Sequence, residues 1–384
     1  TFSNYVHVTE NEGQSWEVLS GDLTRNDPTK LGSSGGPITQ DNTSVEYYCT
    51  IFAANESPLK EGILWVGSDD GLIHVSKDSG ATWDNVTPTN MPDWNMINSI
   101  EPSYFDEGTC YVAATRYKLG DFQPYLYKTT DYGKTWIKIT NGIPAEHFTR
   151  VVREDPKKKG LLYAGTESGM YISFNDGASW SPFQMNLPIV PITDLAIKDD
   201  NLIVATQGRS LWIIDDLTVL HQLDEGKKNQ NTILFKPRES YRTKGRASKK
   251  PSKTAGQNLE NGVITHFLLK NYTEKDTVQL TYTSMAGDTL ANYNSSAKKK
   301  EKKLEVKKGG NTFVWDTRGK GAEKLEGMIF WWASFDGAKA VPGNYKVHLN
   351  VNGNNSSETF TILPDPRAES SVAEMQKQFD FITD

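Results

Sequence analysis

Short stretches of alternating apolar and polar residues fill the first 220 residues, and Gly, Asn or Asp bounds most of them. One series reads EYYCTIFA, ILWVGS, GLIHVS and WDNVTP, and the next reads INSIEPS, TCYVAAT, PYLYKT and WIKIT. Alternation with period two, rich in β-branched and aromatic residues, predicts half-buried strands joined by tight turns. Because the strands recur in groups of four, the pattern predicts an array of small antiparallel sheets over residues 1–223.

The rest of the chain has a different pattern. Residues 224–262 are basic, polar and rich in turn residues, which predicts a linker around one short strand, TILFKP. Residues 263–366 again alternate, as in VITHFLLK and GNYKVHLNV, and predict an immunoglobulin-like or fibronectin-like β-sandwich. Residues 367–384 predict the start of a helix, with Ser370 or Ser371 as its N-cap.

One octapeptide recurs four times, with the pattern Ser/Thr-x-Asp/Asn-x-Gly-x-Ser/Thr-Trp. The copies are TENEGQSW at 9–16, SKDSGATW at 76–83, TTDYGKTW at 129–136 and SFNDGASW at 173–180. Each follows a strand-like stretch, and the spacing is about 40–65 residues, which is typical of one motif per blade of a β-propeller.

Three features shared by the four octapeptides predict a tight turn with a hydrophobic anchor. The Asp or Asn caps backbone N–H groups, Gly supplies a positive φ, and Trp fixes the turn against the sheet. Since one position alone is regularly acidic, the motif favours a structural turn over a calcium site, and no metal or cofactor is expected. The residues assigned to this structural role are Asn11, Gly13, Trp16, Asp78, Gly80, Trp83, Asp131, Gly133, Trp136, Asn175, Gly177 and Trp180.

The octapeptide resembles the Asp-box, or bacterial neuraminidase repeat, of sialidases, xyloglucan-degrading glycosidases and sortilin-type receptors. The resemblance implies that each box joins the third and fourth strands of a blade, away from the ligand face. Longer stretches, such as IFAANESPLKEGILWVGSDDGLIHVSKD and NTFVWDTR, resemble the C-terminal portion of large secreted bacterial proteins of a glycosyl hydrolase or sortilin-like group. The fold expected is all-β, an incomplete Asp-box propeller followed by a sandwich and a beginning helix.

The composition of the chain limits the kinds of partner and location that are expected. The formal net charge of -6 gives no reason to expect nucleic acid. No apolar run approaches the roughly 18 residues of a membrane span. Cys49 and Cys110 lie in strand-like stretches and are expected to be buried free thiols. The first half-blade, near residues 3–20, would leave sheet edges exposed, so the chain is expected to be a piece of a longer propeller. The upstream part of that propeller would then be its partner. The protein is expected to be secreted, periplasmic or associated with the outer membrane.

Candidate chemistry lies in the loops opposite the boxes. Glycoside hydrolysis requires two carboxyl groups, and the candidate acids are Asp69, Asp70, Asp121, Glu146 and Glu167. Arginine and aromatic side chains there would contact a ligand, and these are Arg116, Tyr117, Arg150, Arg209 and Trp94, with Glu46 and His147 nearby.

Three functions remain open at this point. The first is a binding module that recognises a protein, peptide or glycan on the face opposite the boxes. The second is an exported glycoside hydrolase with paired carboxylates in the propeller cleft. The third is a structural subunit of an envelope complex.

Overall fold

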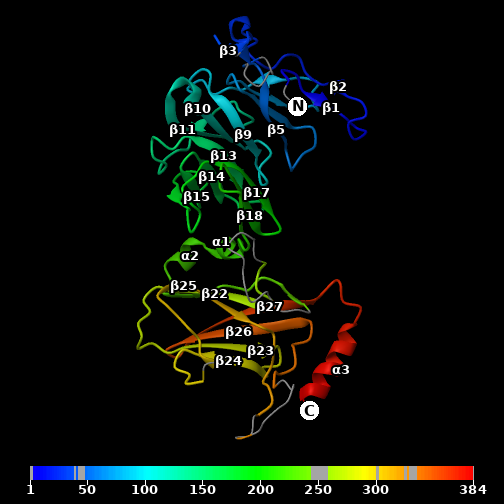
Figure 1. The fold of residues 1–384 in the computed structure, drawn as a ribbon, viewed down its shortest axis with the longest axis vertical. Coiled ribbons are helices and arrows are strands. Elements are labelled where there is room, and N and C mark those ends of the chain that lie inside the picture. Colours follow the sequence, from blue (N-terminus) through cyan, green and yellow to red (C-terminus); the bar gives the residue numbers. More distant parts are fainter. Residues whose placement is uncertain are drawn as a thin grey trace. The chain divides into compact units, whose positions relative to one another are not determined.

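The chain is an all-β protein that divides into two compact units, Thr1–Asp215 and Asp216–Asp384 (Figure 1). The computed structural model describes residues 3–38, 40–41, 48–243, 258–299, 302–323, 327 and 335–383. The first unit is an incomplete β-propeller, and the second is a β-sandwich followed by a helix. The predicted fold class is therefore confirmed.

Each blade of the first unit is an antiparallel meander in which neighbouring strands along the chain are also neighbours in the sheet. The second, third and fourth blades have four strands, and the fifth has three. The blades are β1 (His7–Val8) and β2 (Glu17–Val18); β5 (Ile51–Glu56), β6 (Leu64–Ser68), β7 (Ile73–Ser76) and β8 (Asp84–Asn85); β9 (Met96–Pro102), β10 (Cys110–Arg116), β11 (Asp121–Thr129) and β12 (Ile137–Lys138); β13 (Thr149–Glu154), β14 (Leu162–Thr166), β15 (Gly169–Ser173) and β16 (Ser181–Pro182); and β17 (Ile192–Lys198), β18 (Asn201–Thr206) and β19 (Leu211–Ile214).

Between blades, the second strand lies so close to the next sheet that it carries glycine. A Cβ atom on Gly67 would lie 2.3 Å from a methyl carbon of Ile97, and one on Gly165 would lie 2.6 Å from a methyl carbon of Ile192. Buried apolar side chains of adjacent blades form continuous cores here. Cys110 lies in one of these cores, and both Cys110 and Cys49 are buried and free, as predicted.

The octapeptide folds into the same hydrogen-bonded turn in all four copies. In the second copy the Ser76 hydroxyl accepts a bond from the N–H of Gly80 at 2.8 Å, and the Asp78 carboxylate accepts bonds from the N–H and hydroxyl of Thr82 at 2.9 and 2.6 Å. Gly80 has a φ of +90°, in the left-handed region that glycine adopts without strain. These bonds hold the pKa of Asp78 below its ordinary value.

Each of the last three octapeptides is also fastened to the blade before it. The indole N–H of Trp83, Trp136 and Trp180 donates to the carbonyl of Leu19, Val86 and Ile139 at 3.4, 2.7 and 2.7 Å. Those three residues follow directly on β2, β8 and β12, the last strands of the preceding blades.

The glycine of each turn touches the same residue. A Cβ atom on Gly133 would lie 2.6 Å from the Cβ of Val86, and Gly80 and Gly177 face Leu19 and Ile139 in the same way. The tryptophan thus anchors its turn against the neighbouring blade rather than against its own sheet alone. We call this contact the interblade staple.

The fifth blade ends on an uncovered apolar face. Leu211 in β19 and Ile73 in β7 occupy equivalent positions of their blades. Leu211 pairs with Ala205 and Ile73 pairs with Gly67, and each partner is the next-to-last residue of the second strand of its blade. Ile73 is 0% exposed because the next blade covers it, whereas Leu211 is 68% exposed. Ile213, two residues further along the same strand, is exposed too.

The second unit is a sandwich of a three-stranded and a five-stranded sheet around a core that includes Trp315, Tyr282 and Phe360. The immunoglobulin-like arrangement of its strands stays a prediction. The three-stranded sheet contains β20 (Thr232–Leu234), β22 (Val263–Leu269) and β25 (Gly309–Trp315). The five-stranded sheet contains β21 (Ser240–Arg242), β27 (Asn354–Pro364), β26 (Gly343–Val351), β23 (Val278–Ser284) and β24 (Thr289–Asn294).

The prediction of a linker with one strand over residues 224–262 is wrong in part. This segment supplies two sandwich strands, since β20 pairs with β22 and β21 pairs in parallel with β27, which lies more than a hundred residues later. Such long-range pairing leaves no local periodicity to detect. Residues 244–257 of the segment lie outside the described residues.

Short elements complete the two units, and the last is the predicted terminal helix. Ser371 caps this helix, because its hydroxyl accepts from the N–H of Glu374 at 3.3 Å while the Glu374 carboxylate accepts from the N–H of Ser371 at 2.8 Å. The remaining elements are η1 (Pro28–Lys30), β3 (Ser34–Gly35), β4 (Gln40–Asp41), η2 (Tyr117–Leu119), α1 (Thr218–Gln222), α2 (Glu225–Lys228) and α3 (Val372–Thr383).

The interblade staple predicts unequal effects for one substitution in two copies of the turn. Gly133→Ala combines a φ of +82° with the contact to Val86, whereas Gly13→Ala has a similar φ of +85° but meets no atom closer than 3.7 Å. We expect Gly133→Ala to lower the free energy of unfolding by about 1–3 kcal/mol more than Gly13→Ala, through overpacking. Urea denaturation measures both losses, and equal losses would show that the staple contributes nothing.

Candidate functional site

The meander order gives the first unit two opposite ends. One end holds the octapeptide turns and is called the turn face. The other is called the loop face, and it holds the turns that join the second and third strands, together with the segments that lead into the next blade. The described candidate ligand and acid residues lie on the loops of this second face or at the strand ends beside them, since Arg116, Asp121 and Arg150 belong to β10, β11 and β13.

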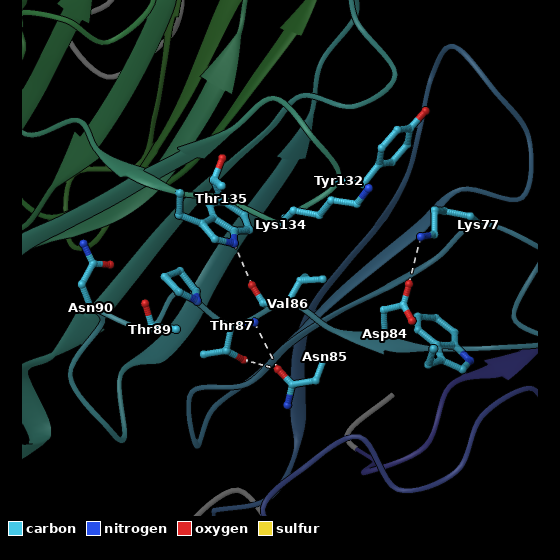
Figure 2. Close-up of a pocket in the computed structure, with 14 residues that line it drawn as sticks. Lys77, Asp84, Asn85, Val86, Thr87, Thr89, Asn90, Tyr132, Lys134 and Thr135 are labelled. Atoms are coloured by element: carbon cyan, nitrogen blue, oxygen red, sulfur yellow. Dashed lines mark hydrogen bonds and ion pairs between the residues drawn. The ribbon is translucent and has the colours of Figure 1, made fainter.

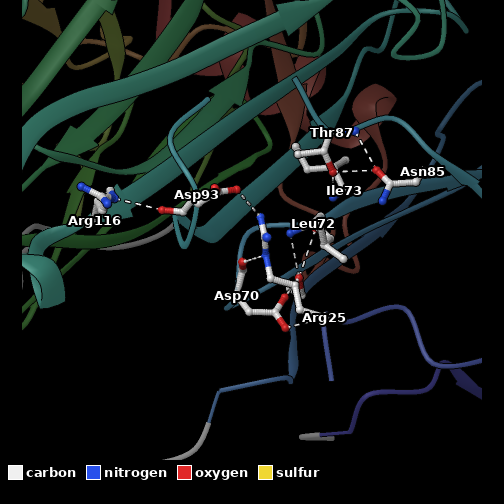
Figure 3. Close-up of polar contacts among 9 residues, drawn as sticks. Arg25, Asp70, Leu72, Ile73, Asn85, Thr87, Asp93 and Arg116 are labelled. Atoms are coloured by element: carbon white, nitrogen blue, oxygen red, sulfur yellow. Dashed lines mark hydrogen bonds and ion pairs between the residues drawn. The ribbon is translucent and has the colours of Figure 1, made fainter. Parts of the chain in front are cut away.

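Arg25 joins three parts of the loop face (Figure 3). Its side chain forms an ion pair with Asp93 at 2.7 Å and lies over the ring of Trp94 at 5.4 Å, and its Nε donates to the carbonyl of Asp70 at 2.8 Å. Asp93 in turn accepts a bond through its carbonyl from Nε of Arg116 at 2.9 Å. Loops from successive blades are thereby held in one network.

Asp70 is a structural member of that network rather than an available acid. Its carboxylate is fully buried and accepts bonds from the N–H of Arg25 at 2.8 Å and the hydroxyl of Ser68 at 2.5 Å. Both of its oxygens are therefore engaged in holding the loop that carries it.

Asp69 is the acid of the loop face with the most altered titration. Burial raises its pKa to about 6, against the opposing effect of a bond that it accepts from the N–H of Thr50 at 2.8 Å. The charge of neighbouring Asp70 adds to the increase, and Lys118 opposes it. A carboxyl group in this range can hold a proton near neutral pH, which is the property of a general acid.

Asp121 is bound within its own blade. It accepts bonds from the hydroxyl of Tyr125 at 2.7 Å and the N–H of Gln123 at 3.1 Å, and Arg116 lies 3.6 Å away. Desolvation alone would raise its pKa, but these bonds and the guanidinium charge outweigh it and lower the pKa below the ordinary value. Asp121 is therefore an anchor for Arg116 at neutral pH.

A group of aromatic rings called the Tyr117 cluster lies beside this loop. Tyr117 stacks on Phe148 with ring centroids 5.3 Å apart, and Phe122 lies 6.1 Å from Phe148 at a tilt. Arg150 covers both Tyr117 and Phe148, at 5.7 and 5.3 Å, and is held by Glu167 at 2.7 Å. Phe122 is 52% exposed, so the cluster presents a ring to solvent.

The other predicted residues are placed as follows. Trp94 packs edge-on against Tyr48 at 5.2 Å. Glu146 and Arg209 are exposed, and Arg209 donates to the carbonyl of Gly208 at 2.9 Å. His147 bonds the hydroxyl of Tyr171 at 2.7 Å. Glu46 lies outside the described residues.

The structure joins most of the predicted residues into two groups and adds several that the sequence did not indicate. Asp70, Trp94 and Arg116 belong to the Arg25 network, and Tyr117, Arg150 and Glu167 to the Tyr117 cluster. Arg25, Asp93, Phe122 and Phe148 were missed. Phe122 could have been found, since it stands in the long loop that also supplies Arg116 and Tyr117.

A comparable network lies toward the turn face, on the same strand β13 that carries Arg150. Arg153 bonds Ser99 at 2.6 Å and the carbonyl of Leu195 at 2.9 Å, and forms an ion pair with Asp194 at 2.8 Å. It also lies 3.7 Å from Glu101, whose pKa burial raises to about 7. The arginine spans three blades here too, which marks the network as structural.

Two further searches of the described residues bear on the kind of site. No group of three or more His, Cys, Asp or Glu side chains in the described ranges has the arrangement of a metal site. Among the helices that the structure describes, none has the length and apolar character needed to cross a bilayer.

Comparison with known proteins finds distant resemblance to xyloglucan-cleaving enzymes. No protein-family model matches the chain. Xyloglucanase Xgh74A of Acetivibrio thermocellus is 26% identical over 167 residues, which are 37% of this chain and 20% of the relative. A probable oligoxyloglucan-reducing end-specific xyloglucanase of Neosartorya fischeri is 39% identical over 88 residues, or 22% of this chain and 10% of the relative. The chain spans a fifth or less of the length of these relatives.

Solved structures with this resemblance include an ancestral GH74 enzyme. It superposes with a TM-score of 0.39 at 13% identity, over 76% of this chain and 35% of that enzyme.

The raised pKa of Asp69 predicts a pH dependence of stability. Its folded-state pKa of about 6 exceeds the ordinary value of 3.8, so the folded state binds the proton more tightly than the unfolded state. This contribution to stability is fully present below about pH 4 and is lost as the pH rises through about 6. Asp69→Asn stays uncharged, so we expect the variant to gain on the order of 2 kcal/mol relative to the wild type between pH 4 and 7.

Urea denaturation of both proteins across that pH range provides the measurement. Glu101 and other groups titrate equally in the two proteins and cancel in the difference. Parallel pH profiles would contradict the assignment of a raised pKa to Asp69.

Proposed function

We propose that the first unit is a glycan-binding β-propeller module that recognises an oligosaccharide of the xyloglucan type on its loop face. The observation that carries the proposal is the Tyr117 cluster, in which stacked rings present Phe122 to solvent beside Arg150 and Glu167. Exposed aromatic rings next to directed polar groups suit the apolar faces and hydroxyls of a sugar. The names of the curated relatives supply the sugar class.

Binding is favoured over hydrolysis because the candidate acids are largely engaged. Asp70 holds Arg25, Asp121 holds Tyr125 and Arg116, and Glu167 holds Arg150. Each of these carboxylates maintains the shape of a loop. A carboxyl group with this role cannot leave its partner to transfer a proton without disturbing the surface around it.

Glycoside hydrolysis remains a second candidate because of Asp69 alone. Its pKa of about 6 suits a general acid near neutral pH, and the relatives at 20% and 10% coverage carry the names of hydrolases. A partner carboxylate would have to come from Glu146 or from another part of a longer protein.

We also propose a secreted or envelope location, because xyloglucan, the polysaccharide that contains such oligosaccharide units, is too large to enter a cell. Cell fractionation of the producing organism checks it, and recovery in the cytoplasm would contradict it.

Removing the exposed ring should weaken binding. We expect Phe122→Ala to bind a xyloglucan heptasaccharide at least tenfold more weakly in isothermal titration calorimetry, since the ring loses its contact with the sugar. Ile137→Ala is the matched control, because Ile137 is also an exposed apolar residue but lies in the outer strand β12. Equal affinity of wild type and Phe122→Ala would overturn the assignment of the binding surface.

The same samples distinguish binding from catalysis. Release of reducing ends from the heptasaccharide or from xyloglucan by the wild type, abolished in Asp69→Asn, would replace the binding proposal with the hydrolase. Binding without release supports the module.

We further propose that the remaining part of the propeller covers the exposed face of the fifth blade. Leu211 and Ile213 occupy positions that are buried against the next blade elsewhere in this unit. Hydrogen exchange in a longer form of the protein should therefore show greater protection of the β19 amides than in residues 1–384. Unchanged exchange would contradict the proposal.

A further inference from the structure

A groove on the outer rim of the first unit lies between the second and third blades, and no function has yet been assigned to it (Figure 2). Its volume is about 760 Å³, within the range of pockets that hold small ligands. One wall is the octapeptide turn at 129–136, and the floor is the chain that leaves β8, residues 84–90. The groove therefore runs along the rim from the octapeptide turn to the connection into the next blade, and it includes no residue of the Arg25 network or the Tyr117 cluster.

Aromatic rings in this groove are held in place by their own hydrogen bonds. The indole N–H of Trp83 donates to the carbonyl of Gly80 at 3.0 Å, and that of Trp136 donates to the carbonyl of Val86 at 2.7 Å. Tyr132, in the same turn as Trp136, also lines the groove. Fixed rings lose little conformational entropy when a ligand packs on them.

The polar lining is mostly neutral. It consists of amides and hydroxyls, and the Asn85 side-chain oxygen already accepts both bonds from Thr87, at 3.1 and 2.7 Å, which orients its amide nitrogen as a donor (Figure 2). The charges are limited to Lys134 and a Lys77–Asp84 pair at 2.9 Å. Since the pair largely neutralises itself, the lining lacks the charge density that would select a strongly charged ligand.

The next pair of blades closes the equivalent space, so the groove is not a simple consequence of the repeat. There the chain after β12 returns to the turn, and the carbonyl of Asn141 accepts from the N–H of Trp180 at 2.8 Å. Gly142 then approaches so closely that a Cβ atom on it would lie 2.2 Å from the Trp180 carbonyl oxygen. As a result, Trp180 is only 4% exposed.

The residues at the corresponding positions of the open groove are Pro88 and Thr89. Thr89 has the Cβ atom that the tight path excludes, so the chain after β8 cannot close over Trp136 in the same way. The opening is thus encoded by the sequence of this one connection.

We propose that this groove binds a short, uncharged oligosaccharide, separately from the loop face. Rings fixed at their indole nitrogens would pack on the apolar faces of sugar units, and Asn85 with the threonine hydroxyls and Asn90 would bond their hydroxyl groups. The groove contains no residue of the Tyr117 cluster, so either site can fail without the other.

Calorimetric titration with cellohexaose, xylohexaose and mannohexaose tests the groove. Thr89→Trp fills the groove at an exposed position, and we expect it to weaken binding of at least one of these hexasaccharides tenfold or more. Ala178→Trp is the matched control, because Ala178 is exposed and corresponds to Lys134 in the next octapeptide, beside the closed space. Thermal unfolding verifies that both variants fold.

The outcomes separate the two sites. The groove proposal is supported if Thr89→Trp removes sugar binding and Phe122→Ala preserves it, whether or not the loop face also binds a sugar. Binding that only Phe122→Ala removes, or no binding of any of the three sugars, overturns the groove proposal.

Discussion

The interblade staple is the contact on which the arrangement of the first unit depends. The fourth strands β8, β12 and β16 are each two residues long, so they provide little backbone pairing at the rim. The staple compensates, because a tryptophan N–H and a glycine without a side chain meet the same residue of the preceding blade. Trp16, in the first octapeptide, is 53% exposed and has no such contact among the described residues. The motif is therefore stabilised as a turn by its own bonds and as a joint by its neighbour.

A frame fixed in this way leaves the loops free to differ between blades. Near the glycines of the second strands, sheets are as close as their backbones allow, so the loops at the ends start from defined positions. Arginines then connect loops of different blades, Arg25 on the loop face and Arg153 toward the turn face. Their ion-pair partners Asp93 and Asp194 are exposed, so these pairs contribute little by charge alone. The connections rest equally on bonds from the two guanidinium groups to the carbonyls of Asp70 and Leu195. Several carboxylates of these loops are thus structural, as Asp70, Asp121 and Glu167 are, and composition cannot distinguish this role from a chemical one.

The blades could be predicted from the sequence because each strand carries its own alternation and each turn its own octapeptide. Pairing between distant segments could not be predicted. The strand β21 was missed because residues 240–242 carry no local sign of their pairing with β27. The site shows the same division. Arg116, Tyr117 and Arg150 were found by their place in the loops, whereas the role of Asp70 depends on Arg25, which lies 45 residues earlier in the chain. Residue type was predictable and residue partnership was not.

Departures from the repeat deserve more weight than the repeat itself when function is sought. Three staples are alike, but the connection after β8 contains Pro88 and Thr89 where the next connection has Asn141 and Gly142. A positive φ of +99° and the absence of a Cβ let Gly142 seal one interblade space, and neither is open to Pro88 or Thr89 without strain. Structural need alone would favour the sealed form, because it buries a tryptophan. The groove beside Trp136, which is only partly buried, departs from the sealed form, and a bound ligand is the reason that we propose for it.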